Sequence, residues 1–98
     1  MKNNNFDMRD VKKTCENKLD IDFRSGGEFN GWIWLDNKKV ARITIPKGRK
    51  GIPPKTYKSM ANQLKLNVED FDSLLECPLS KEKYFIKLRE KLSEQENN

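Results

Sequence analysis

Apolar residues recur along this chain with two different periods, which predict helices in some stretches and strands in others. Near the start, Met8, Val11 and Cys15 are spaced as one face of a helix. Asp7 precedes them and is positioned to cap the helix through its carboxylate. The spacing therefore predicts a first helix over residues 8–17.

Three segments with a period of two follow, and together they predict an antiparallel meander. Apolar and charged residues alternate strictly over 19–24, and the second segment covers 29–35. The third covers 40–45 and follows the second after the short connection Asp36 to Lys39. Because both connections are short, antiparallel pairing of all three strands is the economical arrangement.

The second half of the chain returns to helical spacing and predicts three more helices. The first begins at Pro54, which suits an opening helical turn. Asn67 is positioned to cap the next helix, and Ser80 to cap a last helix over 80–92. Residues 93–98 are polar and are expected to be disordered.

The predicted fold class is α+β, with a three-stranded antiparallel sheet and helices packed on one face. The order of elements is α-β-β-β-α, with additional C-terminal helices. A chain of 98 residues has room for one modest core, so residues 1–98 are expected to form a single domain.

Charge is distributed unevenly, and residues 38–58, the basic segment, account for the net charge of +5. This segment holds eight basic residues and no acidic one, whereas the rest of the chain holds twelve basic and fifteen acidic residues. A positive segment on a mildly acidic body predicts a site for a polyanion. The candidate nucleic-acid-binding residues are Arg42, Lys47, Arg49, Lys50, Lys55 and Lys58.

The absence of histidine removes several classes of chemistry. Histidine-dependent general base catalysis, serine–histidine–aspartate triads and histidine-containing metal sites are excluded. The two cysteines, Cys15 and Cys77, are too few for a closed four-ligand zinc site, so neither a metal nor a cofactor is expected. No signal peptide and no membrane span is visible, which predicts a cytoplasmic protein with free thiols.

Two tryptophans, Trp32 and Trp34, share one face of the second predicted strand. The opposite face of that strand carries Ile33 and Leu35, so apolar groups lie on both sides. One interpretation places the tryptophans in or beside the core. The alternative is that they lie on an open face and stack on nucleic-acid bases.

The order of helix, three strands, basic loop and helix resembles that of the small HicA-type toxins of bacterial and archaeal toxin–antitoxin pairs. Three stretches carry the resemblance: Arg42–Pro46, the basic loop reaching Pro54, and Lys55–Met60 with the following Lys65–Phe71. The resemblance implies a double-stranded-RNA-binding-domain-like core over 6–75, messenger-RNA cleavage, an RNA ligand and an antitoxin-like protein partner.

The chain departs from the family at the catalytic residues. Family members carry a catalytic histidine on a Gly-Ser-His-like motif in the second strand, where this chain has Glu28–Ile33 without a histidine. A further family histidine, after the proline of the third strand, is replaced near Lys47. Without these histidines, we expect the fold and the basic surface of the family to carry over to this chain, but not its ribonuclease chemistry.

The first hypothesis is accordingly a HicA-like RNA-binding protein. One alternative is an active endoribonuclease that uses other groups, with Glu28 as base, Lys47 as acid or phosphate-stabilising group, and Tyr57 as a further acid. A second alternative is a non-enzymatic protein-interaction module, which a stable complex with a small acidic partner would favour.

Overall fold

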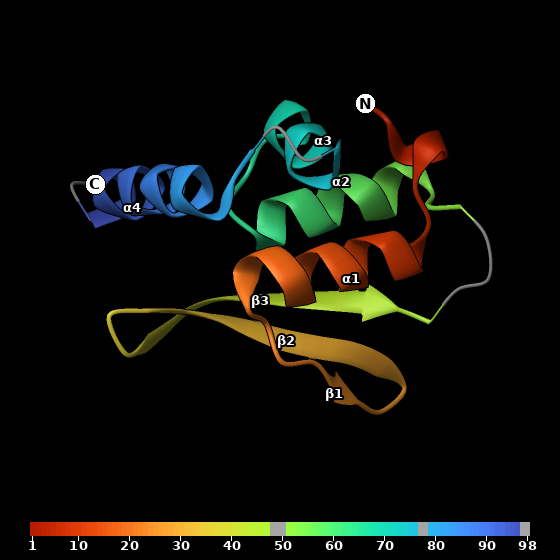
Figure 1. The fold of residues 1–98 in the computed structure, drawn as a ribbon, viewed down its shortest axis with the longest axis horizontal. Coiled ribbons are helices and arrows are strands. Elements are labelled where there is room, and N and C mark those ends of the chain that lie inside the picture. The colour runs from red at the N-terminus through yellow and green to blue at the C-terminus, as the bar shows by residue number, and fades with distance from the viewer. Residues whose placement is uncertain (48–50, 77–78, 97–98) are drawn as a thin grey trace.

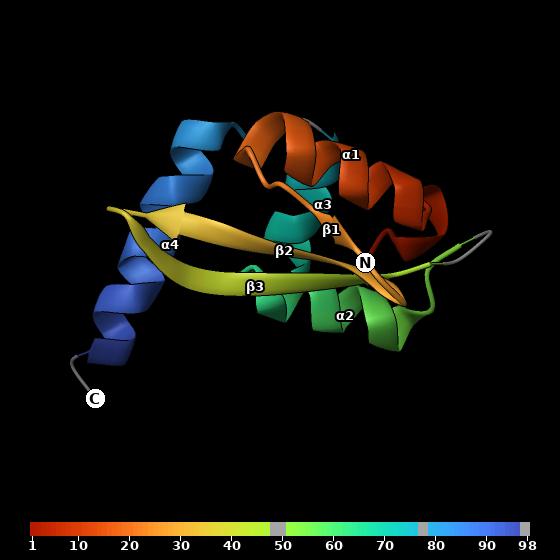
Figure 2. The ribbon, with the colours of Figure 1, turned by 90° about the horizontal axis from the view of Figure 1, so that it is seen from below.

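One twisted sheet forms a layer, and the helices pack on one of its faces (Figure 1). The computed structural model describes residues 1–47, 51–76 and 79–96. Helices α1 and α2 lie over the sheet, α3 packs on both of them, and α4 lies toward the hairpin end (Figure 2). In the described residues, the opposite face of the sheet carries no helix (Figure 2). The bounds are η1 Asn3–Asn5, α1 Met8–Leu19, β1 Arg24–Ser25, β2 Glu28–Leu35, β3 Lys38–Pro46, α2 Pro54–Gln63, α3 Val68–Glu76 and α4 Lys81–Glu96.

The first helix begins where the sequence predicts. The Asp7 side chain accepts a hydrogen bond from the Asp10 backbone N–H, and the Asp10 side chain accepts one from the Asp7 N–H, both at 2.9 Å. This reciprocal cap satisfies two backbone donors that the helix leaves unpaired. The predicted apolar stripe is buried, and the helix runs two residues further than expected, to Leu19.

A tight hairpin joins the two long strands, as predicted. Asp36 and Asn37 have φ values of 53° and 65°, the left-handed conformation that a two-residue turn between antiparallel strands requires. The strands pair from Glu28 opposite Pro46 to Leu35 opposite Lys38. The hairpin therefore forms the body of the sheet.

The prediction of a three-stranded sheet is wrong. Two long antiparallel strands, β2 and β3, form the sheet. Of the segment 19–24 only Arg24 is paired, and with Ser25 it forms a two-residue ladder opposite Phe29 and Asn30. Leu19 is instead the last residue of α1, and Asp20, with φ of 55°, turns the chain out of the helix. The chain remains in the α+β class.

Gly31 lets the side chains of this segment lie directly on β2. A Cβ atom at Gly31 would lie 2.3 Å from Cγ2 of Ile21 and 3.0 Å from Cδ1 of Phe23. The side chains of this segment therefore cover the inner face of β2 directly. Ile21 is buried and Phe23 is partly buried. The alternating pattern therefore reflects side chains that pack on the sheet, although the backbone of these two residues is not paired with a strand.

The last two helices begin at the predicted caps. The Asn67 side chain accepts a hydrogen bond from the Asp70 N–H at 2.7 Å, and the Ser80 hydroxyl accepts one from the Lys83 N–H at 3.3 Å. The prediction that 93–98 is disordered is wrong for residues 93–96, because α4 continues to Glu96. Among the helices described, none combines the length and the apolar composition that a membrane-spanning segment needs.

Candidate nucleic-acid interface

The described cations of the basic segment lie on two elements, β3 and the first turns of α2. Arg42 projects from β3 on the face that no helix covers, and Lys47 directly follows that strand. Lys55 and Lys58 lie on the first two turns of α2, and all four residues are exposed. Two further predicted members of the site lie outside the described residues: Arg49 and Lys50.

Some cations of the other elements make ion pairs, whereas others make none in the described residues, among them Arg9 of α1 and Lys83 and Lys91 of α4. In α4, Lys81 pairs with Asp20, and Arg89 lies 3.2 Å from the Asp36 carboxylate. In the described part of the chain, five cations of the basic segment make no ion pair with any carboxylate. They are Lys38, Lys39, Arg42, Lys55 and Lys58. Their charge is therefore not neutralised within the described fold.

A depression at the end of β3 joins the basic segment to the first helix. It is lined by Arg9 and Lys12 of α1, by Phe29 of β2 and by Lys47. The ammonium groups of Lys12 and Lys47 lie 4.9 Å and 5.0 Å from the centroid of the Phe29 ring. Lys12 also makes an ion pair of 3.1 Å with Glu16.

The sequence reasoning missed Arg9 and Lys12 as neighbours of the basic segment. The available signal was that lysines at this point of the first helix lie off its apolar stripe. The sequence did not indicate which part of the sheet lies beside the polar side of this helix. The fold places it beside Lys47, so positive charge extends from β3 onto α1.

The uncovered face of the sheet carries rings and cations in alternation. Trp32 pairs with Arg42 across the strands, and a register shift after Ile33 pairs Trp34 with Lys39. The Lys39 ammonium lies 4.7 Å from the centroid of the Trp32 ring and 5.4 Å from that of Trp34. Trp34 is 56% exposed, whereas Trp32 is partly buried. Both rings also line a depression whose other residues include Leu19 of α1 and Phe85 of α4.

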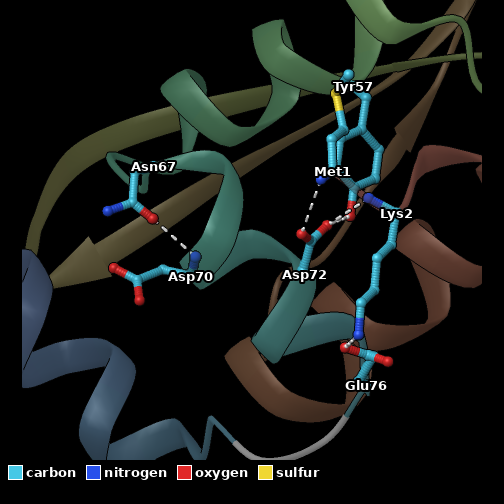
Figure 3. Close-up of polar contacts among 7 residues, drawn as sticks. All are labelled: Met1, Lys2, Tyr57, Asn67, Asp70, Asp72 and Glu76. Atoms are coloured by element: carbon cyan, nitrogen blue, oxygen red, sulfur yellow. Dashed lines mark hydrogen bonds and ion pairs between the residues drawn. The ribbon is translucent and has the colours of Figure 1, made fainter.

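Tyr57, one of the three catalytic candidates, lies inside the core. Its side chain is fully buried, and its hydroxyl donates a hydrogen bond of 2.5 Å to the Asp72 carboxylate (Figure 3). Burial and this hydrogen bond raise the pKa of Tyr57 well above its ordinary value. A buried phenol with a raised pKa is poorly placed to give a proton to a bound RNA.

The other two catalytic candidates face different depressions at the same end of the sheet. Glu28 shares one with Lys55 of α2, and Lys47 shares the other with α1. Pro46 lines both. The Lys47 ammonium also donates a hydrogen bond of 2.8 Å to the Gly26 carbonyl. A general acid and a general base must both reach the reacting phosphodiester, and this placement does not direct the pair to one point.

In the described residues, no group of three or more histidine, cysteine, aspartate or glutamate side chains is arranged to hold a metal ion. The Cys15 thiol is buried in the core, and burial raises its pKa to about 12. Because the thiolate is the form that binds metals and attacks electrophiles, this thiol is inert.

Comparison with known proteins gave no match: no family model, no curated protein and no solved structure is similar to this chain. The resemblance to the HicA-type toxins therefore stays a prediction. Function has to be inferred from the chain's own surface.

Proposed function

We propose that this chain is a small cytoplasmic RNA-binding protein of the HicA-like kind, that it works in a toxin–antitoxin-type system, and that it binds RNA without cleaving it. The basic segment carries this proposal. Five of its cations are exposed, and they make no ion pair in the described residues. The phosphates of a nucleic acid are ligands that would neutralise such cations.

The choice of RNA as the ligand rests on the aromatic rings that lie beside the cations. The cations of β3 alternate with two tryptophan rings on an uncovered sheet face. Proteins that recognise RNA by sequence mostly bind unpaired bases, and they stack these bases on aromatic side chains. A surface that binds only the phosphates of a duplex does not need exposed aromatic rings. The resemblance to a family that acts on messenger RNA points the same way.

The placement of the candidate catalytic groups supports binding without cleavage. The chain has no histidine. The Tyr57 hydroxyl is engaged by Asp72 in the core, and Glu28 and Lys47 face separate depressions. The active endoribonuclease would need a base and an acid at one phosphodiester, and the described residues offer no such pair.

The alternative of a protein-interaction module gains no support from the last helix. Tyr84 and Leu88 of α4 are buried against the core, and the Tyr84 hydroxyl donates a hydrogen bond of 2.9 Å to the Leu64 carbonyl. The apolar face of α4 is therefore used inside the chain. An antitoxin-like protein partner stays a prediction.

The test is a titration of the purified protein against labelled single-stranded and duplex RNA of the same sequence, at two salt concentrations. The RNA is recovered afterwards and examined on a gel. We expect binding that weakens steeply as salt rises, because phosphate contacts release condensed cations, and we expect the RNA to be intact. No binding to either RNA would overturn the proposal. Cleavage that survives repurification and is lost in Glu28→Gln would establish the endoribonuclease instead.

A further inference from the structure

Trp34 carries an aromatic ring that the packing of the fold leaves exposed. Among the aromatic side chains of the described residues it is the exposed one, at 56%, whereas the others are buried or partly buried. An exposed indole near the hairpin end of the sheet leaves a large apolar area in water. Such an area on an uncovered face is typical of a binding surface.

The neighbours of Trp34 define the chemistry of that surface. Trp32 lies on the same face two residues earlier, and the cross-strand partners of the two rings are Arg42 and Lys39. Both rings also line a depression that reaches Phe85 of α4. The surface thus presents flat apolar rings with a cation beside each, and neither cation makes an ion pair in the described residues.

We propose that this face binds a single-stranded segment of RNA, with unpaired bases stacked on Trp34 and Trp32 and with Lys39 and Arg42 contacting the phosphates beside them. The inference rests on the proposed RNA-binding function and names the form of RNA that the site takes. Every base has a π face, so such a platform tolerates many sequences. A base inside a duplex has its faces covered by its neighbours and cannot reach the rings.

Lys39 occupies the rings when no RNA is bound. Its ammonium lies within 5.4 Å of both ring centroids, which is a cation–π arrangement. At an exposed site this contact is weaker than the stacking of a base on the same ring. An incoming base therefore displaces the ammonium from the ring, and a phosphate of the same or the neighbouring nucleotide receives it. The cation passes from ring to phosphate without losing a partner.

The experiment compares Trp34→Ala with the unchanged protein and with Ile86→Ala. Ile86 on α4 is also 56% exposed, so the control removes an equally exposed apolar side chain elsewhere. Each protein is titrated with a single-stranded oligoribonucleotide and with the duplex of the same sequence. We expect Trp34→Ala to weaken single-strand binding roughly 5- to 150-fold and to leave duplex binding unchanged, as one stacked base is lost. Ile86→Ala should leave both unchanged.

Tryptophan fluorescence of the unchanged protein gives a second, independent measurement of binding at this face. The chain has two tryptophans, and both lie on this face, so their emission reports the face alone. Saturating single-stranded RNA should quench the emission of the unchanged protein, and Trp34→Phe, which keeps a ring, should bind more tightly than Trp34→Ala.

The possible outcomes separate this inference from the function on which it rests. Salt-dependent binding of RNA with unchanged fluorescence, or with equal affinity in Trp34→Ala, overturns the stacking and leaves the proposed function standing. Equal losses of single-strand and duplex binding in Trp34→Ala overturn it too. Failure of the unchanged protein to bind either RNA overturns both. Emission that shifts with protein concentration alone would assign the face to a second copy of the chain instead.

Discussion

The Tyr57 hydroxyl and the Asp72 carboxylate are joined by a buried hydrogen bond of 2.5 Å that links α2 to α3 (Figure 3). The same carboxylate accepts a hydrogen bond of 3.0 Å from the Lys2 backbone N–H. The Lys2 ammonium lies 2.6 Å from Glu76 on the next turn of α3. Asp72 therefore holds two helices and the first residues of the chain together, and Tyr57 belongs to this structural cluster.

Replacing Tyr57 with phenylalanine should test that assignment. The change keeps the ring and removes the hydroxyl, so the buried Asp72 carboxylate loses a donor. Hydrogen bonds to charged groups contribute about 1.5–3 kcal/mol, and we expect the free energy of unfolding in urea to fall by about 2 kcal/mol. RNA binding should not change.

Tyr84→Phe is the matched control for Tyr57→Phe. It also removes a buried phenol hydroxyl, but one that donates to a neutral backbone carbonyl, so the expected loss is about 1 kcal/mol. Equal losses in the two variants would contradict the special role of the carboxylate. Loss of an RNA-cleaving activity in Tyr57→Phe alone would return this residue to the list of catalytic groups.

Gly31→Ala tests how closely the segment after α1 packs on β2. The new Cβ atom would lie 2.3 Å from Cγ2 of Ile21, so that segment must move off the sheet. Overpacking of this kind costs about 1–3 kcal/mol, and we expect a lower midpoint in thermal unfolding. Gly27→Ala is the control, because a Cβ atom there meets nothing within 4 Å. A stable Gly31→Ala variant would show that Ile21 has room to move.

The elements fixed by local chemistry could be predicted from the sequence. The cap at Asp7, the turn at Asp36 and the cap at Asn67 all depend on residues within a few positions of one another. The strand expected over 19–24 was wrong because alternation reports only which side chains face inward. The close approach of those side chains to β2 depends on Gly31, a residue of another element, where no Cβ atom stands in their way.

Part of the candidate site could likewise be predicted from the sequence, and part of it could not. The basic segment is contiguous in sequence, so its charge could be counted. The contribution of Arg9 and Lys12 depends on how α1 docks beside Lys47, and no local pattern contains that information. For Tyr57 the sequence led to a residue being included wrongly. A tyrosine near cations can be interpreted as a proton donor until its buried hydrogen-bond partner, Asp72, is known.

Stability should decline at alkaline pH through groups that keep their protons only when folded. Burial raises the pKa of the Cys15 thiol from 9.0 to about 12, with a smaller contribution from the Glu16 carboxylate. Below pH 9 both states bind the proton and nothing is lost. As pH rises from 9 toward 12 the unfolded chain releases the proton while the folded chain retains it, so the free energy of unfolding falls by about 1.4 kcal/mol per pH unit.

Urea unfolding at a series of pH values, with Cys15→Ala beside the unchanged protein, isolates this effect. The variant loses packing at every pH, but its free energy of unfolding should decline less steeply between pH 9.0 and about 10. Above about pH 10 both proteins should decline further, because the pKa values of Tyr57 and Tyr84 are also raised by burial. Parallel slopes below pH 10 would show that the thiol ionises in the folded protein.

Charge reversal on α2 tests the proposed interface most directly. Lys55→Glu with Lys58→Glu removes two cations from about five expected phosphate contacts, so the log–log salt slope for a single strand should shrink from roughly −3.5 to roughly −2. Affinity, measured by titration with labelled RNA, should fall at least about tenfold at low salt, because carboxylates then face phosphates. Lys83→Glu with Lys91→Glu makes the same change in net charge at exposed positions on α4. If the two pairs weaken binding equally, the chain attracts RNA only through its overall charge, and the basic segment is not the site.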